Sequence, residues 1–206
     1  MRRGCFITLE GGEGTGKSTQ TAGLTERLRR SGLEVVATRE PGGSPGAEEI
    51  RALLVAGAVD RWSPTAETLL LYAARADHLE RVIRPALDRG AWVVCDRFAD
   101  STRAYQTGAS PSLLTALERE VVDGERPDLT LLFDLPAEEG LARAAARGEA
   151  ATRFEARDPD FHERLRAAFL EIARTDPGRC TVIDARPRAE AVEAAVWAAV
   201  QRRLDP

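Results

Sequence analysis

Lysine is almost absent from this chain of 206 residues. Lys17 is the only lysine among 29 basic residues, so arginine supplies the basic charge at every other position. A GTPase that reads guanine through an Asn-Lys-x-Asp segment would need a second lysine, so that class is excluded. Keeping one lysine at one position indicates a need for a compact ammonium group there, because a guanidinium is planar and directs its donors differently.

Cysteine and histidine are also scarce. Cys5, Cys95 and Cys180 lie far apart in three different apolar runs, which is neither a metal-site spacing nor a disulfide framework. We expect them to be buried as small hydrophobic residues in a reducing cytosol. His78 and His162 lie in charge-rich, helical stretches, and we expect them on the solvated surface, without a catalytic role.

Long hydrophobic runs are missing. No apolar stretch approaches the roughly 18 residues of a membrane span, and Met1-Arg2-Arg3 leads directly into a strand-like run without a secretory apolar segment. We therefore predict a cytoplasmic protein with no membrane partner. The net charge of −4 lacks the basic excess of a nucleic-acid-binding surface, so we predict no nucleic acid partner. Any bound anion must meet a local cluster of arginines.

Short β-rich runs alternate with longer helical patterns, which is typical of an α/β fold with a parallel sheet. The runs are almost continuously apolar, as expected for strands that helices cover on both faces. We predict one domain over residues 1–206, with three layers around a central five-stranded parallel sheet. The predicted strands are Phe6–Glu10, Glu34–Thr38, Trp92–Cys95, Leu129–Leu135 and Thr181–Ile183.

Apolar residues at helical spacing predict four helices. A separate segment, residues 143–160, is rich in alanine and arginine and has few large apolar side chains. It should bury little, and we predict that it is a small mobile lid and not a second domain. The predicted helices run from Lys17 to a stop at Gly32, from Pro64 to Leu87, from Leu113 to Val122 and from Ala189 to Leu204.

A phosphate-binding loop is the strongest single motif. The segment that contains Lys17 matches Gly-x-x-x-x-Gly-Lys-Ser/Thr, and it follows a strand and opens a helix, as this motif requires. Its glycines let successive backbone N–H groups converge on phosphate oxygens, and the helix dipole adds positive potential. We predict a P-loop fold that binds ATP through Gly11, Gly12, Glu13, Gly14, Thr15, Gly16, Lys17, Ser18 and Thr19.

A second anion site is predicted at the ends of two strands. Asp96 and Arg97 follow one apolar run, and Arg39 follows another. Ligands of open α/β sheets gather at the carboxyl ends of strands, where two arginines can form a fork for a phosphate dianion. Ser18 and Asp96 supply oxygens for Mg²⁺ beside the nucleotide. The combination indicates a kinase that acts on a phosphorylated small molecule.

Four further strings make the resemblance to a family specific. They are Arg39-Glu40-Pro41-Gly42-Gly43, Tyr72-Ala73-Ala74-Arg75, Cys95-Asp96-Arg97-Phe98 and Ser101-Thr102-Arg103-Ala104-Tyr105-Gln106. In this order, and with a similarity that extends from Phe6 to about Ala185, they resemble the bacterial thymidylate kinases. The resemblance implies transfer of the γ-phosphoryl group of ATP to dTMP, giving dTDP for dTTP synthesis, with Mg²⁺ as cofactor. It also implies a homodimer, for which the helix around Leu69–Leu87 is a candidate interface.

The resemblance also implies roles for individual residues. Glu13 would lie near the sugar and phosphate of the acceptor, Arg39 and Arg97 would hold that phosphate, and Asp96 and Ser101 would lie beside it. Arg75 and Gln106 would hydrogen-bond the base, and Tyr105 would exclude a ribose hydroxyl. Arg143 would lie against adenine. With no arginine in Gly12–Thr15, the catalytic arginine is implied to be in the lid stretch Arg147–Asp158, at Arg153.

The chain departs from the family pattern at three positions. An aromatic residue usually stacks on the base four positions before Arg75, where this chain has Leu71 followed by Tyr72. Either Leu71 supports the base or the register differs by one residue and Tyr72 does. Thr107 replaces a common glycine, and Thr152 replaces a frequent aspartate in the lid.

Two other functions remain open at the level of sequence. One is a kinase for another nucleoside monophosphate or a deoxynucleoside, which shares the loop but not the base pocket. The other is a nucleotide-dependent switch or silent binding module, which would bind a nucleotide without transferring phosphate. Paired Arg39 and Arg97 argue against the switch, because a switch needs no second anion site.

Overall fold

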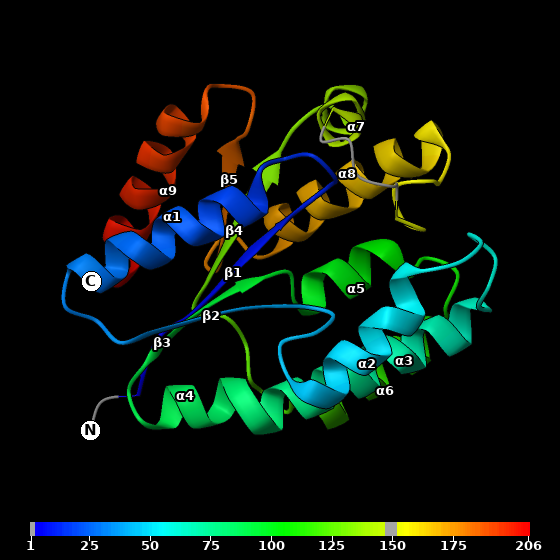
Figure 1. Cartoon of the computed structure of the whole chain (residues 1–206), viewed down its shortest axis with the longest axis horizontal. Coiled ribbons are helices and arrows are strands. Elements are labelled where there is room, and N and C mark those ends of the chain that lie inside the picture. The colour runs from blue at the N-terminus through cyan, green and yellow to red at the C-terminus, as the bar shows by residue number, and fades with distance from the viewer. Residues whose placement is uncertain (1–2, 147–151) are drawn as a thin grey trace.

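A computed structural model describes residues 3–146 and 152–206. At its centre the described chain forms the predicted five-stranded parallel sheet, and its strand order is β2-β3-β1-β4-β5 (Figure 1). Every strand begins and ends within one or two residues of its predicted limits. The strands are β1 (Phe6–Gly11), β2 (Val35–Arg39), β3 (Trp92–Asp96), β4 (Leu129–Asp134) and β5 (Cys180–Asp184).

Strand register brings the predicted site residues to one edge of the sheet. Arg39 at the end of β2 lies opposite Asp96 at the end of β3, and Asp96 lies opposite Leu9 of β1. Parallel strands place all carboxyl ends at the same edge, so the phosphate loop after β1 and the residues after β2 and β3 converge there.

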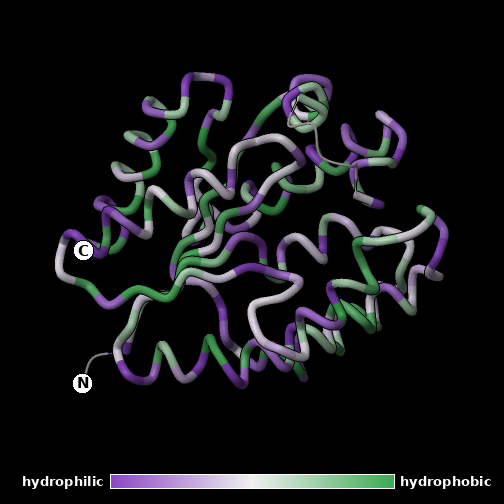
Figure 2. The backbone as a smooth tube through the Cα atoms, viewed as in Figure 1, coloured by the Kyte–Doolittle hydropathy of each residue, from purple (hydrophilic) through white to green (hydrophobic). Residues whose placement is uncertain are grey.

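Both faces of the sheet are apolar and covered. Ile7 and Leu9 of β1 pack in one cluster with α1 and α9, whereas Phe6, the residue before Ile7, packs in a cluster on the other face. This explains the continuous apolar runs, since alternate residues enter different cores. Green marks the central strands in Figure 2, and green and purple alternate along the helices around them.

Helices α1 (Lys17–Arg30) and α9 (Ala189–Leu204) cover one face of the sheet (Figure 1). The opposite face carries a long continuous helix made of α3, a π-helical segment η1 and α4, followed by α5 and α8. Pro85 lies just after η1, where its missing N–H and its ring prevent a regular α-helical turn. The bounds are α3 (Pro64–His78), η1 (Leu79–Ile83), α4 (Arg84–Asp88), α5 (Ala99–Tyr105) and α8 (Pro159–Thr175).

The remaining helices lie at the carboxyl edge of the sheet or beside α3. They are α2 (Pro45–Val55), which packs on α3, α6 (Pro111–Leu117) with its π-helical continuation η2 (Glu118–Val122), and α7 (Ala137–Ala145). The four predicted helices are confirmed, but α2, α5, α7 and α8 were not predicted. Two of them carry ordinary start signals: Ser44 precedes α2 and Pro45 is its first residue, and Asp158, just before α8, accepts from the Phe161 amide (2.8 Å).

In the described part of the predicted lid, two side chains are more buried than the composition suggests. The expectation that residues 143–160 bury little is wrong for Arg153, which is 3% exposed, and for Phe154, whose ring meets Tyr105 edge-on at 5.7 Å. Arg147 lies outside the described residues. Within those residues no helix is long and apolar enough to cross a membrane. Cys95 and Cys180 are buried as expected, and Cys5 is partly buried.

Candidate active site

Close packing holds the phosphate loop between β1 and α1 in its curled form. Gly14 has a φ of 66°, and a Cβ there would lie 1.9 Å from the carbonyl oxygen of Gly140 on α7. A Cβ on Gly140 would in turn lie 2.4 Å from the carbonyl oxygen of Glu13. Sequence reasoning did not identify Gly140, because its importance comes from a contact between segments far apart in the chain.

Lys17 is 7% exposed and lies within the curl of the loop. Its Nζ donates to the Gly12 carbonyl (2.5 Å) and to Thr15 Oγ1 (3.2 Å). Burial, together with the nearby charge of Arg97, lowers its pKa to about 8. An ammonium group in this position has a strong electrostatic preference for an anionic ligand.

Ser18 and Asp96 meet beside the loop. Ser18 Oγ donates to Asp96 Oδ2 at 2.7 Å, which joins the first turn of α1 to the end of β3. Hydroxyl and carboxylate oxygens are suitable for Mg²⁺, which usually takes one or two protein ligands and completes its octahedron with water and substrate phosphate. The residues present therefore fit the predicted ion.

One large cavity joins the two predicted anion sites. It has a volume of about 420 Å³ and opens along the carboxyl edge of the sheet. Lys17 lines it at one side, and Arg39 and Arg97 line it at another. The predicted site residues that line it are Glu13, Gly14, Thr15, Gly16, Lys17, Ser18, Thr19, Arg39, Leu71, Arg75, Asp96, Arg97, Ser101, Tyr105, Gln106 and Arg143.

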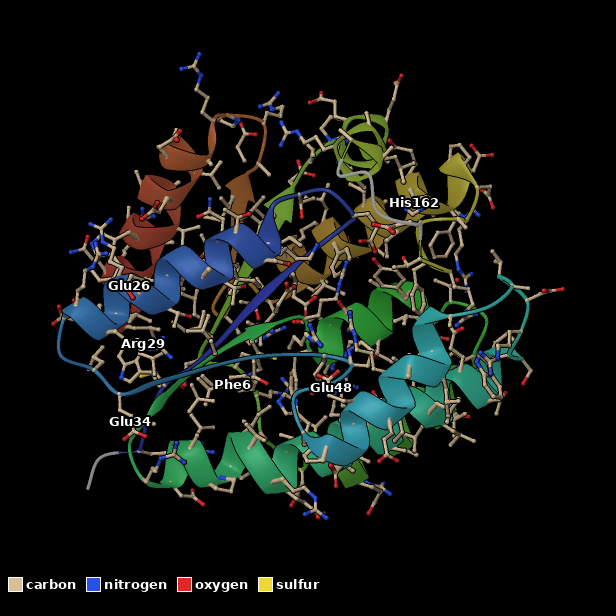
Figure 3. The ribbon with its side chains drawn as sticks, in the orientation of Figure 1. Phe6, Glu26, Arg29, Glu34, Glu48 and His162 are labelled. Carbon is tan, nitrogen blue, oxygen red and sulfur yellow. The ribbon has the colours of Figure 1, made fainter. Side chains whose placement is uncertain are left out.

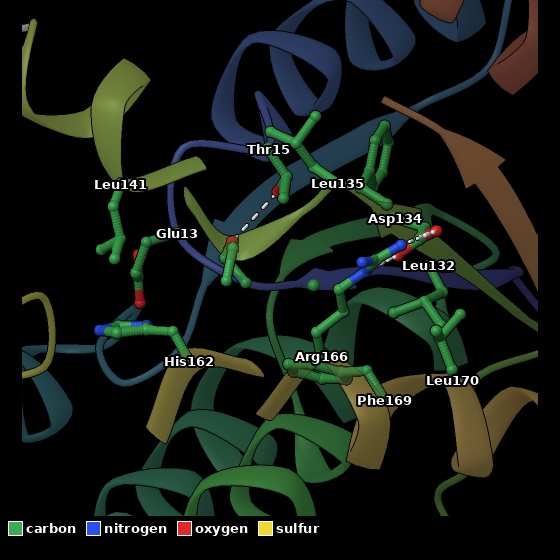
Figure 4. A pocket seen from close by; sticks show the side chains of 14 residues that line it. Glu13, Thr15, Leu132, Asp134, Leu135, Leu141, His162, Arg166, Phe169 and Leu170 are labelled. Carbon is green, nitrogen blue, oxygen red and sulfur yellow. Dashed lines mark hydrogen bonds and ion pairs between the residues drawn. The ribbon is translucent and has the colours of Figure 1, made fainter. Parts of the chain in front are cut away.

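Gly11 and Gly12 lie on the other side of the loop. They line a separate small cavity together with residues of β4, α7 and α8 (Figure 4). Their carbonyl oxygens accept from the cations of the site, Gly11 from Arg97 and Gly12 from Lys17. Of the predicted nucleotide-binding residues, these two do not line the large cavity.

Arg97 is directed by an unusual backbone. Its φ of 71° is in the left-handed region, which non-glycine residues seldom occupy and which is often found at functional sites. The turn carries its guanidinium under the phosphate loop, where it donates to Gly11 O (2.9 Å), Ser101 Oγ (3.2 Å) and Glu13 Oε1 (3.1 Å). A guanidinium has five N–H donors, so these contacts leave capacity for a phosphate.

Glu13 is the acidic partner of this arginine. Burial raises its pKa, but the charges of Arg97 and Lys17 outweigh that effect and bring it to about 2. Tyr105 also donates its hydroxyl to Glu13 Oε1 at 2.6 Å. Glu13 thus stays ionised and fixes both Arg97 and Tyr105 at the wall of the cavity.

Arg39 and Arg51 add positive charge at the acceptor side. Arg39 Nη2 donates to both carboxylate oxygens of Glu48 (3.0 and 3.2 Å), and Glu48 lies near the start of α2 (Figure 3). Arg51 of α2 also lines the cavity and donates to the Pro41 carbonyl at 2.7 Å. Arg51 was not predicted, because α2 itself was not predicted.

The ambiguity between Leu71 and Tyr72 is resolved by burial. Leu71 lines the cavity, whereas Tyr72 is 1% exposed and packs in the core beneath it. The prediction that Tyr72 contacts the acceptor is therefore wrong. Tyr72 instead supports Arg75, whose guanidinium carbon lies 4.8 Å from the centre of its ring.

Arg75 is held by a buried polar network. Its Nε donates to Glu40 Oε2 (2.8 Å) and its Nη2 to Thr102 Oγ1 (2.9 Å). His78 Nδ1 lies 3.0 Å from the other oxygen of Glu40, and its Nε2 lies 2.7 Å from Thr38 Oγ1. Both histidines were predicted on the surface, and both are buried. The charged residues beside each histidine in the sequence suggested a solvated helix, but the side of the helix that carries the histidine packs inside the fold.

His162 is the second histidine that was predicted on the surface and is buried. It lies near the start of α8 (Figure 3), is 4% exposed and turns its ring towards Glu13 in the small cavity (Figure 4). Its charge contributes to lowering the Glu13 pKa, after those of Arg97 and Lys17 and the Tyr105 hydrogen bond. Arg166 and Asp134 form an ion pair at 2.7 Å in the same cavity.

Arg143 and Arg153, the two described arginines with predicted roles in the lid segment, lie in different surroundings. Arg143 lines the large cavity and donates to the carbonyls of Ala185 (2.8 Å) and Arg186 (3.1 Å), so its predicted contact with adenine stays a prediction. Arg153 does not line that cavity. Its Nε donates to Leu54 O (2.9 Å), its Nη1 to Val59 O (2.8 Å) and its Nη2 to Glu67. The prediction that Arg153 meets the transferring phosphoryl group does not fit this arrangement.

The fold and the site define a P-loop phosphotransferase with a second anion site, the class of kinases that act on phosphorylated small molecules. A family model for thymidylate kinase matches residues 9–196. The chain belongs to the thymidylate kinase family.

Curated relatives and a solved structure agree. A thymidylate kinase of Caulobacter vibrioides is 62% identical over 207 residues, which cover 99% of this chain and 99% of the relative. A thymidylate kinase of Bradyrhizobium sp. (strain ORS 278) is 54% identical, covering 98% of this chain and 92% of the relative. The crystal structure of thymidylate kinase from Ehrlichia chaffeensis superposes with a TM-score of 0.79 at 33% identity, covering 97% of this chain and all of that one.

Proposed function

We propose that this protein transfers the γ-phosphoryl group of ATP to dTMP and produces dTDP. The observation that carries the proposal is a single cavity lined by Lys17 of the phosphate loop and by Arg39 and Arg97 at neighbouring strand ends. A kinase needs its donor and acceptor phosphates within reach of each other, and this cavity supplies cations for both. Arg75 and Gln106 supply polar groups for the base in the same cavity.

Positioning and charge stabilisation account for the chemistry. The acceptor phosphate has a second pKa near 6, so it is largely dianionic near neutral pH and needs no general base. One of its oxygens attacks the γ-phosphorus, the bond to the β–γ bridging oxygen breaks, and ADP leaves. Lys17 and the loop amides bind the donor phosphates, while Arg97 and Arg39 hold the acceptor phosphate in line. Ser18 and Asp96 would hold Mg²⁺, which neutralises charge on the donor phosphates when it is bound.

Glu13 organises the acceptor side of the cavity. Ionised at neutral pH, it fixes the Arg97 guanidinium and the Tyr105 hydroxyl. The fixed phenol ring narrows the space beside the acceptor sugar. A 2′-hydroxyl would enter that space, so we propose that Tyr105 favours deoxyribose over ribose.

A homodimer and the predicted cytoplasmic location remain proposals. Three large hydrophobic side chains are exposed on α2, on the loop after it and on α3: Leu53 at 42%, Val59 at 37% and Leu69 at 47%. Leu69 belongs to the helix proposed as an interface. Burying such a group between two copies would remove apolar surface from water.

A panel of acceptors tests the reaction. ADP release is measured with Mg²⁺-ATP and, in parallel, dTMP, dUMP, dCMP, dAMP and thymidine. We expect dTMP to be the best acceptor and thymidine, which lacks the phosphate, to be inactive. Transfer to dAMP or to thymidine in preference to dTMP would contradict the proposal. Tight ATP binding without transfer to any acceptor would favour the binding-module alternative.

A further inference from the structure

A buried carboxylate outside the cavity contacts a residue inside it. Glu67 of α3 is 2% exposed, and its Oε1 accepts from Gln106 Nε2 at 2.6 Å. Its Oε2 accepts from Arg153 Nη2, and Arg157 Nη2 lies 3.6 Å from Oε1. Two arginines therefore neutralise Glu67, and among the described residues its other side-chain partner is the amide of Gln106.

This contact restricts how Gln106 can face a base. A carboxylate accepts hydrogen bonds and cannot donate them, so the Gln106 amide must direct its nitrogen towards Glu67. Rotating the amide by half a turn would place two oxygens at this short distance, which is repulsive. The Thr68 hydroxyl lies within hydrogen-bond distance of both the Pro64 carbonyl (2.8 Å) and Gln106 Oε1 (3.2 Å), to which it can donate. An amide oxygen has two lone pairs, so Gln106 Oε1 can accept from Thr68 and still accept from a base.

Arg75 offers a donor to the same cavity. Its Nη1 is buried and has no hydrogen-bond partner among the described residues, and both Arg75 and Gln106 line the cavity. A fixed donor on Arg75 and a fixed acceptor on Gln106 match adjacent groups of thymine: a ring carbonyl and the N3–H. Cytosine presents an amino group and an unprotonated N3 at those positions, so donor would face donor and acceptor would face acceptor.

We infer that Glu67 is a positioning residue for base selection. It locks the Gln106 amide in the orientation that accepts from the N3–H of thymine or uracil, and so it disfavours cytosine. The inference rests on the proposed function, since it concerns the base of the acceptor nucleotide. It also assigns Arg153 a role different from the one predicted: this arginine neutralises Glu67 and keeps it in place.

A matched pair of variants isolates the lock. Replacing Glu67 alone would leave Arg153 buried and unpaired, which threatens folding. The double variant Glu67→Gln/Arg153→Gln removes both charges, and a glutamine at position 67 can accept from or donate to Gln106, so the amide is no longer locked. The single variant Arg153→Gln is the control, because it keeps the carboxylate and still offers it a donor.

The measured quantity is the ratio of kcat/KM for dTMP to kcat/KM for dCMP. A loss of activity or stability common to both acceptors cancels in this ratio. We expect the control to keep the ratio of the unsubstituted protein and the double variant to lower it about tenfold, the worth of one hydrogen bond. Equal ratios in the control and the double variant would overturn the inference. Absence of transfer by the unsubstituted protein would instead contradict the proposed function.

A measurement on the unsubstituted protein covers the case in which the double variant does not fold. The chain has no asparagine and three glutamines, so its ¹⁵N side-chain amide spectrum contains only Gln20, Gln106 and Gln201. Gln201 is exposed and serves as an internal reference. We expect one Gln106 proton far downfield of Gln201 and slow to exchange, as a hydrogen bond to a carboxylate requires. Gln106 protons that resemble those of Gln201 would overturn the inference.

Discussion

Buried charge has opposite consequences at two residues of this protein. Lys17 is buried and donates to one carbonyl and one hydroxyl, neither of which carries a charge. Burial therefore lowers its pKa. Arg153 is buried with three acceptors, two backbone carbonyls and a carboxylate, so it contributes to the folded structure without a ligand. A buried cation that binds an anionic substrate is expected to destabilise the folded protein when no substrate is bound. A structural cation is expected to have its hydrogen-bond acceptors within the fold.

Lys17→Met should separate stability from activity. The lowered pKa of Lys17 means that its charge opposes folding below about pH 8, an effect relieved as the pH rises towards the ordinary value of 10.5. We expect the variant without nucleotide to be more stable than the parent by about 1–3 kcal/mol at pH 7, with the gain fading at high pH. Turnover should be almost abolished. Denaturant unfolding at several pH values and an ADP-release assay check the two outcomes, and a variant less stable at pH 7 would contradict the first.

Arg153→Met should act mainly on stability. The substitution leaves the Glu67 carboxylate without its strongest partner, and breaking a buried ion pair costs about 3–5 kcal/mol. A catalytic arginine in the lid would behave differently, lowering kcat with little change in melting temperature. Thermal unfolding and steady-state kinetics on the same preparation distinguish the two. An unchanged melting temperature with a large loss of kcat would restore the catalytic role.

At the scale of elements, the junction between β3 and α5 is held by a carboxyl group from β1. Glu10 accepts from the Phe98 amide (2.8 Å) and from Ser101 Oγ (2.6 Å), and Ser101 Oγ also accepts from Arg97. These contacts hold the turn that gives Arg97 its positive φ. The position of Arg97, the proposed acceptor-binding arginine, therefore depends on β1, β3 and α5.

The pH dependence of stability should report this junction. Burial, with the nearby charge of Asp100, raises the pKa of Glu10 from 4.5 to about 8. Its contribution is fully present below about pH 4.5 and is lost as the pH rises through about 8, since the folded state holds the proton more tightly than the unfolded chain does. We expect Glu10→Gln, which does not titrate, to reduce the fall in unfolding free energy over this range by on the order of 3 kcal/mol. If the unfolding free energies of parent and variant fell in parallel over this pH range, Glu10 would not be the cause of the fall.

At the scale of the whole molecule, the face formed by α2 and α3 is the best candidate for contact with a second copy. These helices pack on each other at the carboxyl edge, and they carry Arg51, Arg75 and Glu67 inward while Leu53 and Leu69 point outward. An interface on the outer side would therefore restrict the motion of the two helices that line the proposed acceptor site.

Leu69→Glu should convert a dimer into monomers. A charged group at this exposed apolar position could not be buried between two copies without a partner. Sedimentation velocity of parent and variant at the same concentration checks the outcome. Val182→Glu is a suitable control, because Val182 is similarly exposed (48%) but lies on β5. A monomeric parent, or dimers of both variants, would rule out this face.

Local patterns in the chain were sufficient for the sheet, its strands and the phosphate loop. Continuous apolar runs report burial on both faces, and the loop motif is contiguous, so neither depends on distant residues. The cluster of Arg39, Asp96 and Arg97 was also predictable, because parallel strands place their ends at one edge. The recognition of Leu71, Arg75, Tyr105 and Gln106 rested on the family resemblance.

Contacts between distant segments determined the features that the sequence did not predict. Whether Leu71 or Tyr72 faces the cavity depends on the rotation of α3 against the sheet, and a helical pattern with apolar residues on several sides does not specify it. The burial of His78 and His162 depends on partners in β2, on Glu40 and on the phosphate loop. Arg153 sits in a stretch whose composition suggests exposure, yet acceptors from α2, the following loop and α3 surround it. The sequence around a residue does not show which distant residues pack against its side chain. Burial and ion pairing depend on those tertiary contacts.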